Sequence, residues 1–166
     1  MIADAGVIGL PNAGKTSLLN AITRASGKVG SYAFTTLEPN LGNFYGFILA
    51  DIPGLIEGAS KGKGLGHKFL RHIRRTRFIL HCISLENKDP FGDYQVVRNE
   101  LSLYDNSLAD KEEVVVLTKT DLAEEQTAGK IKRFFERKFK KVLTVTVEDK
   151  ESVKKFATDL VRFLSK

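Results

Sequence analysis

The sequence predicts an α/β fold in which helices cover a mainly parallel β-sheet. Short runs rich in Val, Ile, Leu and Phe alternate along the whole chain with segments of helical periodicity. Runs that are short and mostly apolar are typical of strands buried on both faces of a parallel sheet. The 166 residues, 42% of them hydrophobic, suffice for one continuous core, so we expect a single domain over residues 1–166.

Apolar runs predict strands at residues 5–9, 43–50, 78–84, 113–117 and 141–147. Residues 37–47 are expected to supply a further edge strand. Apolar side chains recur at helical spacing over residues 97–108, 131–139 and 153–164, which predicts three helices. Another helix is predicted to follow Lys15, and a further one is expected over residues 65–75.

Composition limits the classes of function. No stretch approaches the roughly 18 to 20 uninterrupted apolar residues that span a bilayer, and no basic region followed by an apolar one begins the chain. We expect a cytoplasmic protein with no membrane partner, acting as a monomer. The single cysteine, Cys82, lies in an apolar run and cannot form an internal disulfide, which suits a reducing compartment. The net charge of +6 favours an anionic partner, but it does not distinguish a phosphate ligand from a nucleic acid or a ribosomal surface.

A glycine-rich loop at residues 9–16 predicts phosphate binding. Its sequence, GLPNAGKT, fits the pattern G-x-x-x-x-G-K-[ST] and lies between a predicted strand and a predicted helix, as that motif requires. Glycines allow successive backbone N–H groups and the helix N-terminus to point at phosphate oxygens. Lys15 would then bridge the β- and γ-phosphates, and the Thr16 hydroxyl would ligate Mg²⁺. The alternative is a plain glycine-rich turn, which the strand-to-helix context argues against.

Asp51 ends an apolar run and begins the sequence Asp-Ile-Pro-Gly. A carboxylate at the tip of a strand suits Mg²⁺ or a water bound to it, and the N–H of Gly54 would contact the terminal phosphate. Asp, Pro and Gly also favour plain turns, but the position downstream of the phosphate loop favours the nucleotide role. Glycines at 54, 58, 62, 64 and 66 predict that this segment changes conformation when a ligand arrives or leaves.

Residues 31–40 form a second candidate sensing segment, because Thr35 and Thr36 lie there between the first helix and the edge strand. One of these hydroxyls could complete the Mg²⁺ shell only while a γ-phosphate is present, which would couple the order of the segment to the nucleotide. Taken alone, the pair would be an ordinary Thr-rich turn.

The sequence Thr-Lys-Thr-Asp at residues 118–121 predicts which base is bound. It follows the apolar run at 114–117, so its side chains are expected at the carboxyl end of a parallel strand, where open α/β folds bind ligands. A carboxylate accepts hydrogen bonds from the N1–H and the exocyclic amine of guanine, whereas adenine offers an acceptor at N1. Asp121 therefore selects guanine, and the stem of Lys119 packs along the ring. The alternative is an Asp that caps a helix after a strand.

These segments together resemble the G domain of Obg-family GTPases: ADAGVIGLPNAGKT at 3–16, YAFTTLEPNLG at 32–42 and DIPGLIEGAS at 51–60, with a compatible continuation through 64–77. The resemblance covers nearly the whole chain. It implies a Ras-like P-loop NTPase fold with a mainly parallel six-stranded sheet, GTP hydrolysis with Mg²⁺, and a role in assembly of the large ribosomal subunit. It also favours Thr36 over Thr35 as the metal-ligating hydroxyl.

Three features depart from the family pattern. Thr118 stands in place of the usual Asn, a variant similar to the T-K-x-D of Rho-type GTPases, so guanine binding should survive. The last nucleotide loop, usually Ser-Ala, reads Thr146-Val147, whose backbone N–H would contact the guanine carbonyl. The glycine-rich N-terminal domain of full-length Obg proteins is absent from this chain.

Two residues bear on catalysis. Leu55 follows D-x-x-G at the position where Ras-type enzymes place a Gln that orients the attacking water. Because Leu cannot hydrogen-bond to that water, we expect slow intrinsic hydrolysis. Asn12 resembles the Asn that coordinates a monovalent cation in potassium-stimulated relatives, so K⁺ is a candidate second cofactor.

Two basic clusters are candidates for RNA contact. Along residues 130–141 basic side chains are interleaved with Phe134, Phe135 and Phe139, but helical periodicity points these rings at the core, which favours a solvated basic face. The family resemblance makes the second cluster the better candidate for rRNA: Lys68, Arg71, Arg74, Arg75 and Arg77. The histidines are too scattered to indicate a zinc site.

We therefore predict a GTP/GDP-binding switch that hydrolyses GTP slowly with Mg²⁺. A nucleotide-binding module with little turnover is one alternative, and a P-loop ATPase or nucleoside kinase, which Asp121 opposes, is another. The predicted catalytic residues are Lys15, Thr36 and Gly54, and the predicted metal ligands are Thr16, Thr36 and, through water, Asp51. The predicted nucleotide-binding residues are Gly9, Pro11, Asn12, Ala13, Gly14, Lys15, Thr16, Ser17, Phe34, Thr35, Thr36, Asp51, Gly54, Thr118, Lys119, Asp121, Leu122, Thr146 and Val147.

Overall fold

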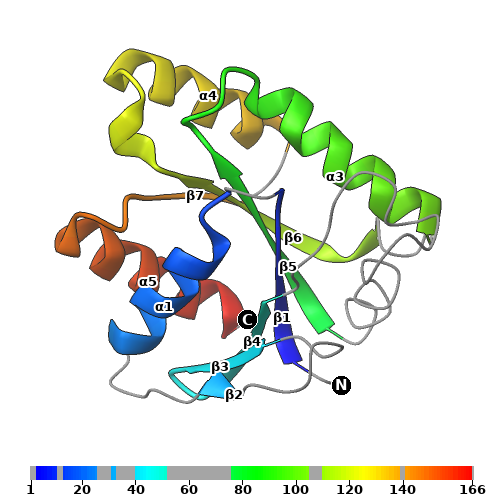
Figure 1. Cartoon of the computed structure of the whole chain (residues 1–166), viewed down its shortest axis with the longest axis vertical. Helices are drawn as coiled ribbons and strands as arrows, with labels where there is room; N and C mark the ends of the chain where they lie inside the picture. The colour runs from blue at the N-terminus through cyan, green and yellow to red at the C-terminus, as the bar shows by residue number, and fades with distance from the viewer. Residues whose placement is uncertain are drawn as a thin grey trace.

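A computed structural model of the chain describes residues 3–10, 13–25, 31–32, 40–51, 76–104, 110–138 and 141–165. A sheet with the strand order β2-β3-β4-β1-β5-β6-β7 forms its centre (Figure 1). The strands are β1 Ala3–Ile8, β2 Ser31–Tyr32, β3 Asn40–Phe44, β4 Phe47–Asp51, β5 Thr76–Ser84, β6 Glu112–Thr118 and β7 Val142–Val145. The helices are α1 Lys15–Ala25, α3 Pro90–Tyr104, α4 Glu125–Lys138 and α5 Lys150–Leu164, with a 3-10 turn, η3, at Thr120–Leu122.

Helices cover both faces of the sheet, α1 and α5 on one side and α3 and α4 on the other (Figure 1). Ile22 of α1 and Phe156 of α5 belong to one apolar core with the sheet. Leu101 of α3 packs on the opposite face, and Phe135 of α4 packs there beside β6 and β7. The predicted α/β class, with helices on both faces, is confirmed.

Parallel pairing runs through β4, β1, β5, β6 and β7, whereas β3 is antiparallel to β4 and β2 is antiparallel to β3. The parallel strands therefore all end at the same edge of the sheet, where the predicted site loops follow β1, β4, β6 and β7. Six strands match the predicted sheet, and the two-residue β2 adds a seventh at its edge.

The prediction of one strand over residues 43–50 was wrong. A tight turn at Tyr45 and Gly46 divides this run into β3 and β4, and both residues have positive φ angles, 49° and 89°. Two positive φ angles in a two-residue loop match the twist of an antiparallel hairpin. The Asn43 side chain fixes the turn, because its Oδ1 accepts the Gly46 N–H at 3.1 Å. The expected edge strand within 37–47 is therefore β3.

The predicted helix at 97–108 begins earlier than its apolar spacing indicated. Asp89 caps the first turn of α3: its Oδ1 accepts the Gly92 N–H at 2.9 Å, and its carbonyl accepts the Asp93 N–H at 3.1 Å. Pro90 suits the first helical position because its missing N–H would have no partner there. The helices α4 and α5 confirm the predictions at 131–139 and 153–164 over their described residues. The predicted helix at 65–75 and the glycines from 54 to 66 lie outside the described residues.

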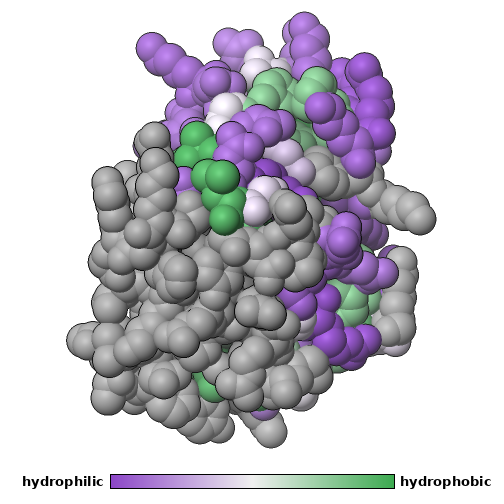
Figure 2. Space-filling view, turned by 90° about the vertical axis from the view of Figure 1, so that its right-hand side faces the viewer, coloured by the Kyte–Doolittle hydropathy of each residue, from purple (hydrophilic) through white to green (hydrophobic). Residues whose placement is uncertain are grey.

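Aromatic rings of the basic α4 segment face the protein. Phe135 is 1% exposed, and the ring of Phe134 lies 4.0 Å from that of Phe91, centroid to centroid. Lys138 lies over the Phe134 ring at 5.1 Å. Figure 2 shows hydrophilic side chains gathered at the end of the molecule where α3 and α4 lie in Figure 1. The interpretation of a solvated basic face backed by core aromatics is confirmed for the described residues, while Phe139 lies outside them.

The side chains of Cys82 and His81 are buried on opposite faces of β5. Cys82 is 1% exposed, as predicted, and burial raises the pKa of its thiol to about 12. On the α3 side, His81 Nδ1 lies 2.9 Å from Glu113 Oε2, and the imidazole stacks on Tyr94. Burial, reinforced by the Glu113 carboxylate, raises the pKa of the Tyr94 hydroxyl to about 12.

Among the described residues, no helix has the length and apolarity needed to cross a membrane.

Candidate nucleotide-binding site

A cavity of about 350 Å³ opens at the carboxyl edge of the sheet. Its described lining joins residues of the glycine-rich loop to the Lys119 loop: Leu10, Ala13, Gly14, Lys15, Thr16, Ser17 and Lys119. Two loops far apart in the sequence therefore share one cavity, as their positions after parallel strands predicted.

Two glycines of the phosphate loop are required by backbone geometry. A Cβ on Gly9 would lie 2.7 Å from the carbonyl oxygen of Cys82, a separation that real Cβ atoms essentially never show. Gly14 has a φ of 84°, in the region that favours glycine. The loop closes through a bond from the Ala13 N–H to the Leu10 carbonyl at 3.0 Å. The helix α1 then begins at Lys15, so its positive N-terminal end lies at the cavity.

Lys15, Thr16 and Asp51 form the charged end of the site. Lys15 Nζ lies 3.3 Å from Asp51 Oδ1, and the Thr16 hydroxyl donates to Asp51 Oδ2 at 3.4 Å. Asp51 ends β4 beside β1, opposite Val7, and only 4% of its surface is exposed. The carboxylate of Asp51 therefore offers hard oxygen atoms beside a cation and a hydroxyl.

This oxygen set fits Mg²⁺. The ion prefers one or two protein oxygens and completes its shell with water and phosphate oxygens. Within the described part of the chain, no group of three or more His, Cys, Asp or Glu side chains could hold a metal ion. Thr16 and Asp51 thus suit an ion shared with a phosphate ligand rather than one enclosed by the protein.

Thr118 connects the two loops. Its hydroxyl, at the end of β6, donates to the carbonyl of Ala13 at 2.7 Å, across 105 residues of sequence. The side chain is buried, so this bond is shielded from water. The contact of Thr118 is therefore with the phosphate loop, and its influence on a bound ligand would come through the position of that loop.

Lys119 follows in a left-handed conformation, with φ 55° and ψ 41°. Its ammonium lies 2.8 Å from Oε2 of Glu86, just beyond the end of β5. Glu86 was missed by the sequence analysis, although its position after a parallel strand was the available signal.

Thr146 is the centre of a hydrogen-bond cluster with the residues that follow Lys119. Its Oγ1 lies 2.6 Å from Thr120 Oγ1, accepts the Asp121 N–H at 3.1 Å and donates to Asp121 Oδ1 at 3.4 Å. A hydroxyl has one proton and two acceptor sites, so these contacts are all satisfied when Thr120 donates to Thr146 and Thr146 donates to Asp121. The chain of bonds ends on the carboxylate predicted to read guanine. Thr120 was also missed, because the motif leaves its position variable.

The loop at Thr146 and Val147, the last of the predicted nucleotide loops, leads into α5. The Thr146 N–H is occupied by the Ser152 hydroxyl at 2.9 Å, and the Asp149 N–H donates back to the Thr146 carbonyl at 3.1 Å. No hydrogen bond joins the Val147 N–H to any described residue. Of the two amides predicted to face a guanine carbonyl, that of Thr146 is therefore already bonded within the chain.

The structure thus brings together the described members of the predicted set at one edge of the sheet, with Leu122 exposed at the end of η3. Seven residues predicted to bind nucleotide or to bear on catalysis lie outside the described residues: Pro11, Asn12, Phe34, Thr35, Thr36, Gly54 and Leu55. The basic cluster proposed for rRNA is described only at Arg77, whose guanidinium lies 4.8 Å from the Phe78 ring centroid.

Comparisons with known proteins agree with this geometry. A family model described as 50S ribosome-binding GTPase matches residues 4–119. The GTPase Obg of Pelagibacter ubique (strain HTCC1062) is 46% identical over 169 residues, which cover 99% of this chain and 52% of that protein. The chain therefore spans about half the length of that curated relative.

Solved structures show the same fold. The G domain of the T. maritima FeoB iron transporter has a TM-score of 0.62 at 20% identity and covers 98% of both chains. A structure of Era in complex with MgGDPNP and nucleotides 1506–1542 of 16S ribosomal RNA has a TM-score of 0.65 at 17% identity, covering 98% of this chain and 56% of that one. At these identities the likeness concerns the fold alone.

Proposed function

Since the chain belongs to the 50S ribosome-binding GTPase family, as an Obg-type G domain, we propose that it binds GTP and GDP with Mg²⁺ and hydrolyses GTP slowly. One observation carries the proposal: the phosphate loop and the Thr-Lys-Thr-Asp loop line one cavity and are joined by the Thr118–Ala13 hydrogen bond. We further propose that residues 1–166 act as one G domain.

Phosphate binding would rest on Lys15 and on the first turn of α1. The Lys15 ammonium and the backbone N–H groups of residues 14–17 lie at the cavity and would hold the β- and γ-phosphate oxygens. Thr16 and Asp51 would hold Mg²⁺, Asp51 through water, with Thr36 as a further ligand. When bound, Mg²⁺ supplies positive charge to the phosphate oxygens as negative charge develops on them.

Base recognition would rest on Asp121 and Val147. The Asp121 carboxylate accepts from the N1–H and amine of guanine, while Thr146 already donates to Oδ1 and fixes its direction. The Val147 N–H would donate to the guanine carbonyl, and the stem of Lys119 would cover the ring. Adenine would meet an acceptor where Asp121 needs a donor, so the site should reject ATP.

Hydrolysis is proposed to be slow because Leu55 cannot orient a water molecule. Asn12 supports a role for K⁺ near the phosphates, where a monovalent cation would add positive charge in the transition state. A binding module with little turnover is the second candidate, and the same Leu55 favours it.

Association with a ribosomal particle is proposed from the family and from the net charge of +6. The basic cluster from Lys68 to Arg77 is the candidate contact with rRNA.

Single-turnover release of phosphate from GTP tests the proposal, with ribosomal subunits present or absent and with KCl or NaCl. We expect slow hydrolysis that subunits and K⁺ accelerate, and loss of GTP binding in Lys15→Ala. Equal rates in KCl and NaCl would contradict the K⁺ role. No phosphate release under any condition, with GTP bound, would favour the binding module.

A further inference from the structure

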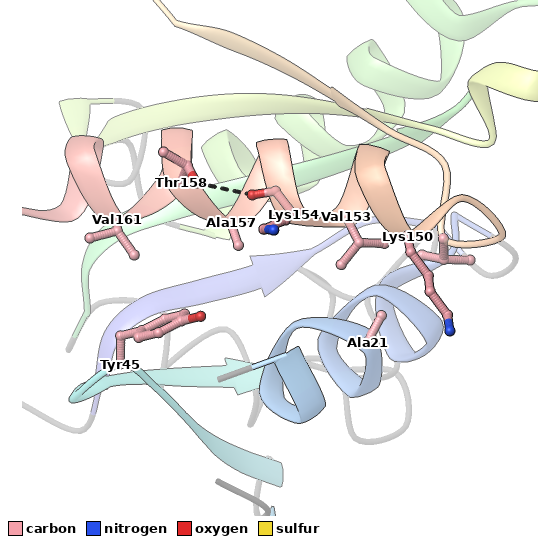
Figure 3. A pocket seen from close by; sticks show the side chains of 9 residues that line it. Ala21, Tyr45, Lys150, Val153, Lys154, Ala157, Thr158 and Val161 are labelled. Carbon is pink, nitrogen blue, oxygen red and sulfur yellow. Dashed lines mark hydrogen bonds between the residues drawn. The ribbon is translucent and has the colours of Figure 1, made fainter. Parts of the chain in front are cut away.

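A second groove, which meets the candidate nucleotide site at Val147, lies between α1, α5 and the turn that joins β3 to β4 (Figure 3). Its volume is about 780 Å³, more than twice that of the nucleotide cavity at about 350 Å³. A volume of this order accommodates several side chains of a partner.

The floor of the groove is apolar and made of small side chains. Val153, Ala157 and Val161 lie along one face of α5, and Ala21 faces them from α1 (Figure 3). Val153 and Ala157 are nearly buried by α1 and the sheet, at 8% and 6% exposed, so the floor is packed in place. Small side chains leave room for larger apolar side chains to enter from outside.

One end of the groove is closed by Tyr45. The hairpin turn carries this residue, and Figure 3 shows its ring directed toward α5. The side chain is 53% exposed, and its ring packs edge-on against Phe44, with the centroids 5.0 Å apart. A Tyr held by a fixed turn beside an apolar floor is the kind of residue that contributes strongly to protein interfaces.

The rim of the groove is positively charged. Lys150 and Lys154, one helical turn apart on α5, are the charged residues among its described lining. Neither forms a salt bridge with a described residue. An occupant with two carboxylates about 6 Å apart would match them, because four residues of a helix rise by about that distance.

The chemistry of the walls selects a helical occupant. The helices α1 and α5 satisfy their own backbone groups, so the groove offers no strand edge for pairing. An extended peptide would bring unpaired N–H and C=O groups onto an apolar floor, whereas a helix satisfies these groups internally. The lining of α5 from Lys150 to Val161 is about 17 Å long, which corresponds to about three turns of a partner helix.

We infer that this groove is a docking site for an amphipathic helix of a partner protein, with an apolar stripe and two acidic residues one turn apart beside it. A helix seated there would contact three elements that each meet the candidate nucleotide site. The helix α1 begins at Lys15, α5 follows the Thr146–Val147 loop, and the β3–β4 hairpin ends at Asp51.

Phage display tests the inference. The library consists of 16-residue helical peptides with a fixed Leu stripe and randomised flanks, selected on the immobilised 166-residue chain. We expect the selected peptides to carry Asp or Glu at positions four apart, and to lose at least tenfold in affinity against Lys150→Glu/Lys154→Glu. A peptide with Lys in place of those acidic residues should bind the double variant better than it binds the original chain.

The matched control is Lys155→Glu, an exposed change of the same charge on α5 outside the groove, which should leave affinity unchanged. Tyr45→Asn removes the ring while keeping a residue that tolerates positive φ, and should weaken binding at least fivefold. Thermal melting and GDP binding, measured on every variant, separate misfolding and any failure of the nucleotide proposal from failure of the groove.

The inference is overturned if selected flanks are neutral or basic, or if the charge reversals leave the affinity unchanged. It is also overturned if no peptide is enriched while vesicles containing phosphatidylglycerol bind and lose binding in Lys150→Glu/Lys154→Glu, because the surface would then face a membrane. Concentration-dependent dimerisation that the same variants abolish would assign the groove to a second copy of the chain instead.

Discussion

The base end and the phosphate end of the candidate site differ in the length of the contacts that hold them. At the base end three contacts within the chain are short: 2.7 Å from Thr118 to Ala13, 2.6 Å between Thr120 and Thr146, and 2.8 Å between Lys119 and Glu86. At the phosphate end, the groups are charged and the contacts are longer: Lys15 and Thr16 share Asp51 at 3.3 and 3.4 Å. Base selectivity and phosphate affinity are therefore expected to be separable by mutation.

The largest effect is expected at the phosphate end. Lys15→Ala removes the cation that would contact the phosphates and also leaves the buried Asp51 carboxylate without its cation. Loss of one partner of a buried charged pair costs about 2–5 kcal/mol, so nucleotide affinity should fall on the order of 100-fold or more. Titration of fluorescent GDP and IDP checks this, with Lys111→Ala as the control. Unequal losses of affinity for GDP and IDP would contradict the proposed separation of base selectivity from phosphate affinity.

Thr118→Val should come next. It keeps the shape of the side chain but leaves the Ala13 carbonyl without its donor, which costs about 1–3 kcal/mol. Urea unfolding should report that loss in the free energy of unfolding, and GDP affinity should fall about tenfold as the two loops separate. Thr118→Ser restores the hydroxyl and should recover most of both. Equal losses in the Ser and Val variants would exclude the hydrogen bond as the cause.

A smaller and more selective effect is expected at Thr146. Thr146→Val removes the donor to Asp121 Oδ1 and the acceptor of the Asp121 N–H, so GDP affinity should fall by about 1 kcal/mol, or roughly fivefold. The ratio of guanine to hypoxanthine nucleotide affinity should fall as well, because Asp121 then loses its fixed direction. Thr120→Val should act in the same sense and more weakly, and Thr120→Ser should restore the original ratio. An unchanged ratio would separate this cluster from base reading.

The smallest effect is expected in the core beneath both ends, at Cys82. Burial raises the pKa of its thiol in the folded protein to about 12, above the ordinary value of 9.0. A raised pKa means that the unfolded chain releases its proton first, so stability is fully present below about pH 9 and is lost as the pH rises toward 12. Urea midpoints should therefore fall above pH 9 less steeply in Cys82→Ala than in the original chain. Reaction of Cys82 with a thiol reagent at pH 8 should require unfolding.

Much of this arrangement was predictable from the sequence, for a physical reason. Strands that are apolar on both sides predict a parallel sheet, and loops that follow such strands meet at one edge, so Lys15, Asp51 and Thr118 could be expected near one another. The phosphate-loop pattern also predicted glycine at positions 9 and 14, because that requirement comes from local backbone geometry.

Other features could not be predicted because they depend on tertiary contacts. The apolar run at 43–50 hid the turn at Tyr45 and Gly46, since Tyr normally favours a strand and the positive φ angles become clear only in the hairpin. Glu86 and Thr120 carry no motif, and their partners lie 33 and 26 residues away. The groove beside α5 arises from the distance between packed elements, which spacing within one helix does not encode.

Base selection by Asp121 is the central claim, and exchange of its carboxylate for an amide tests it most directly. Affinities of GTP, XTP and ATP are measured for the original chain and for Asp121→Asn. The account predicts a strong preference of the original chain for GTP, and a shift toward XTP in the variant, because the 2-oxo group of xanthine needs a donor. A variant that still prefers GTP to XTP, to the same degree as the original chain, would contradict it.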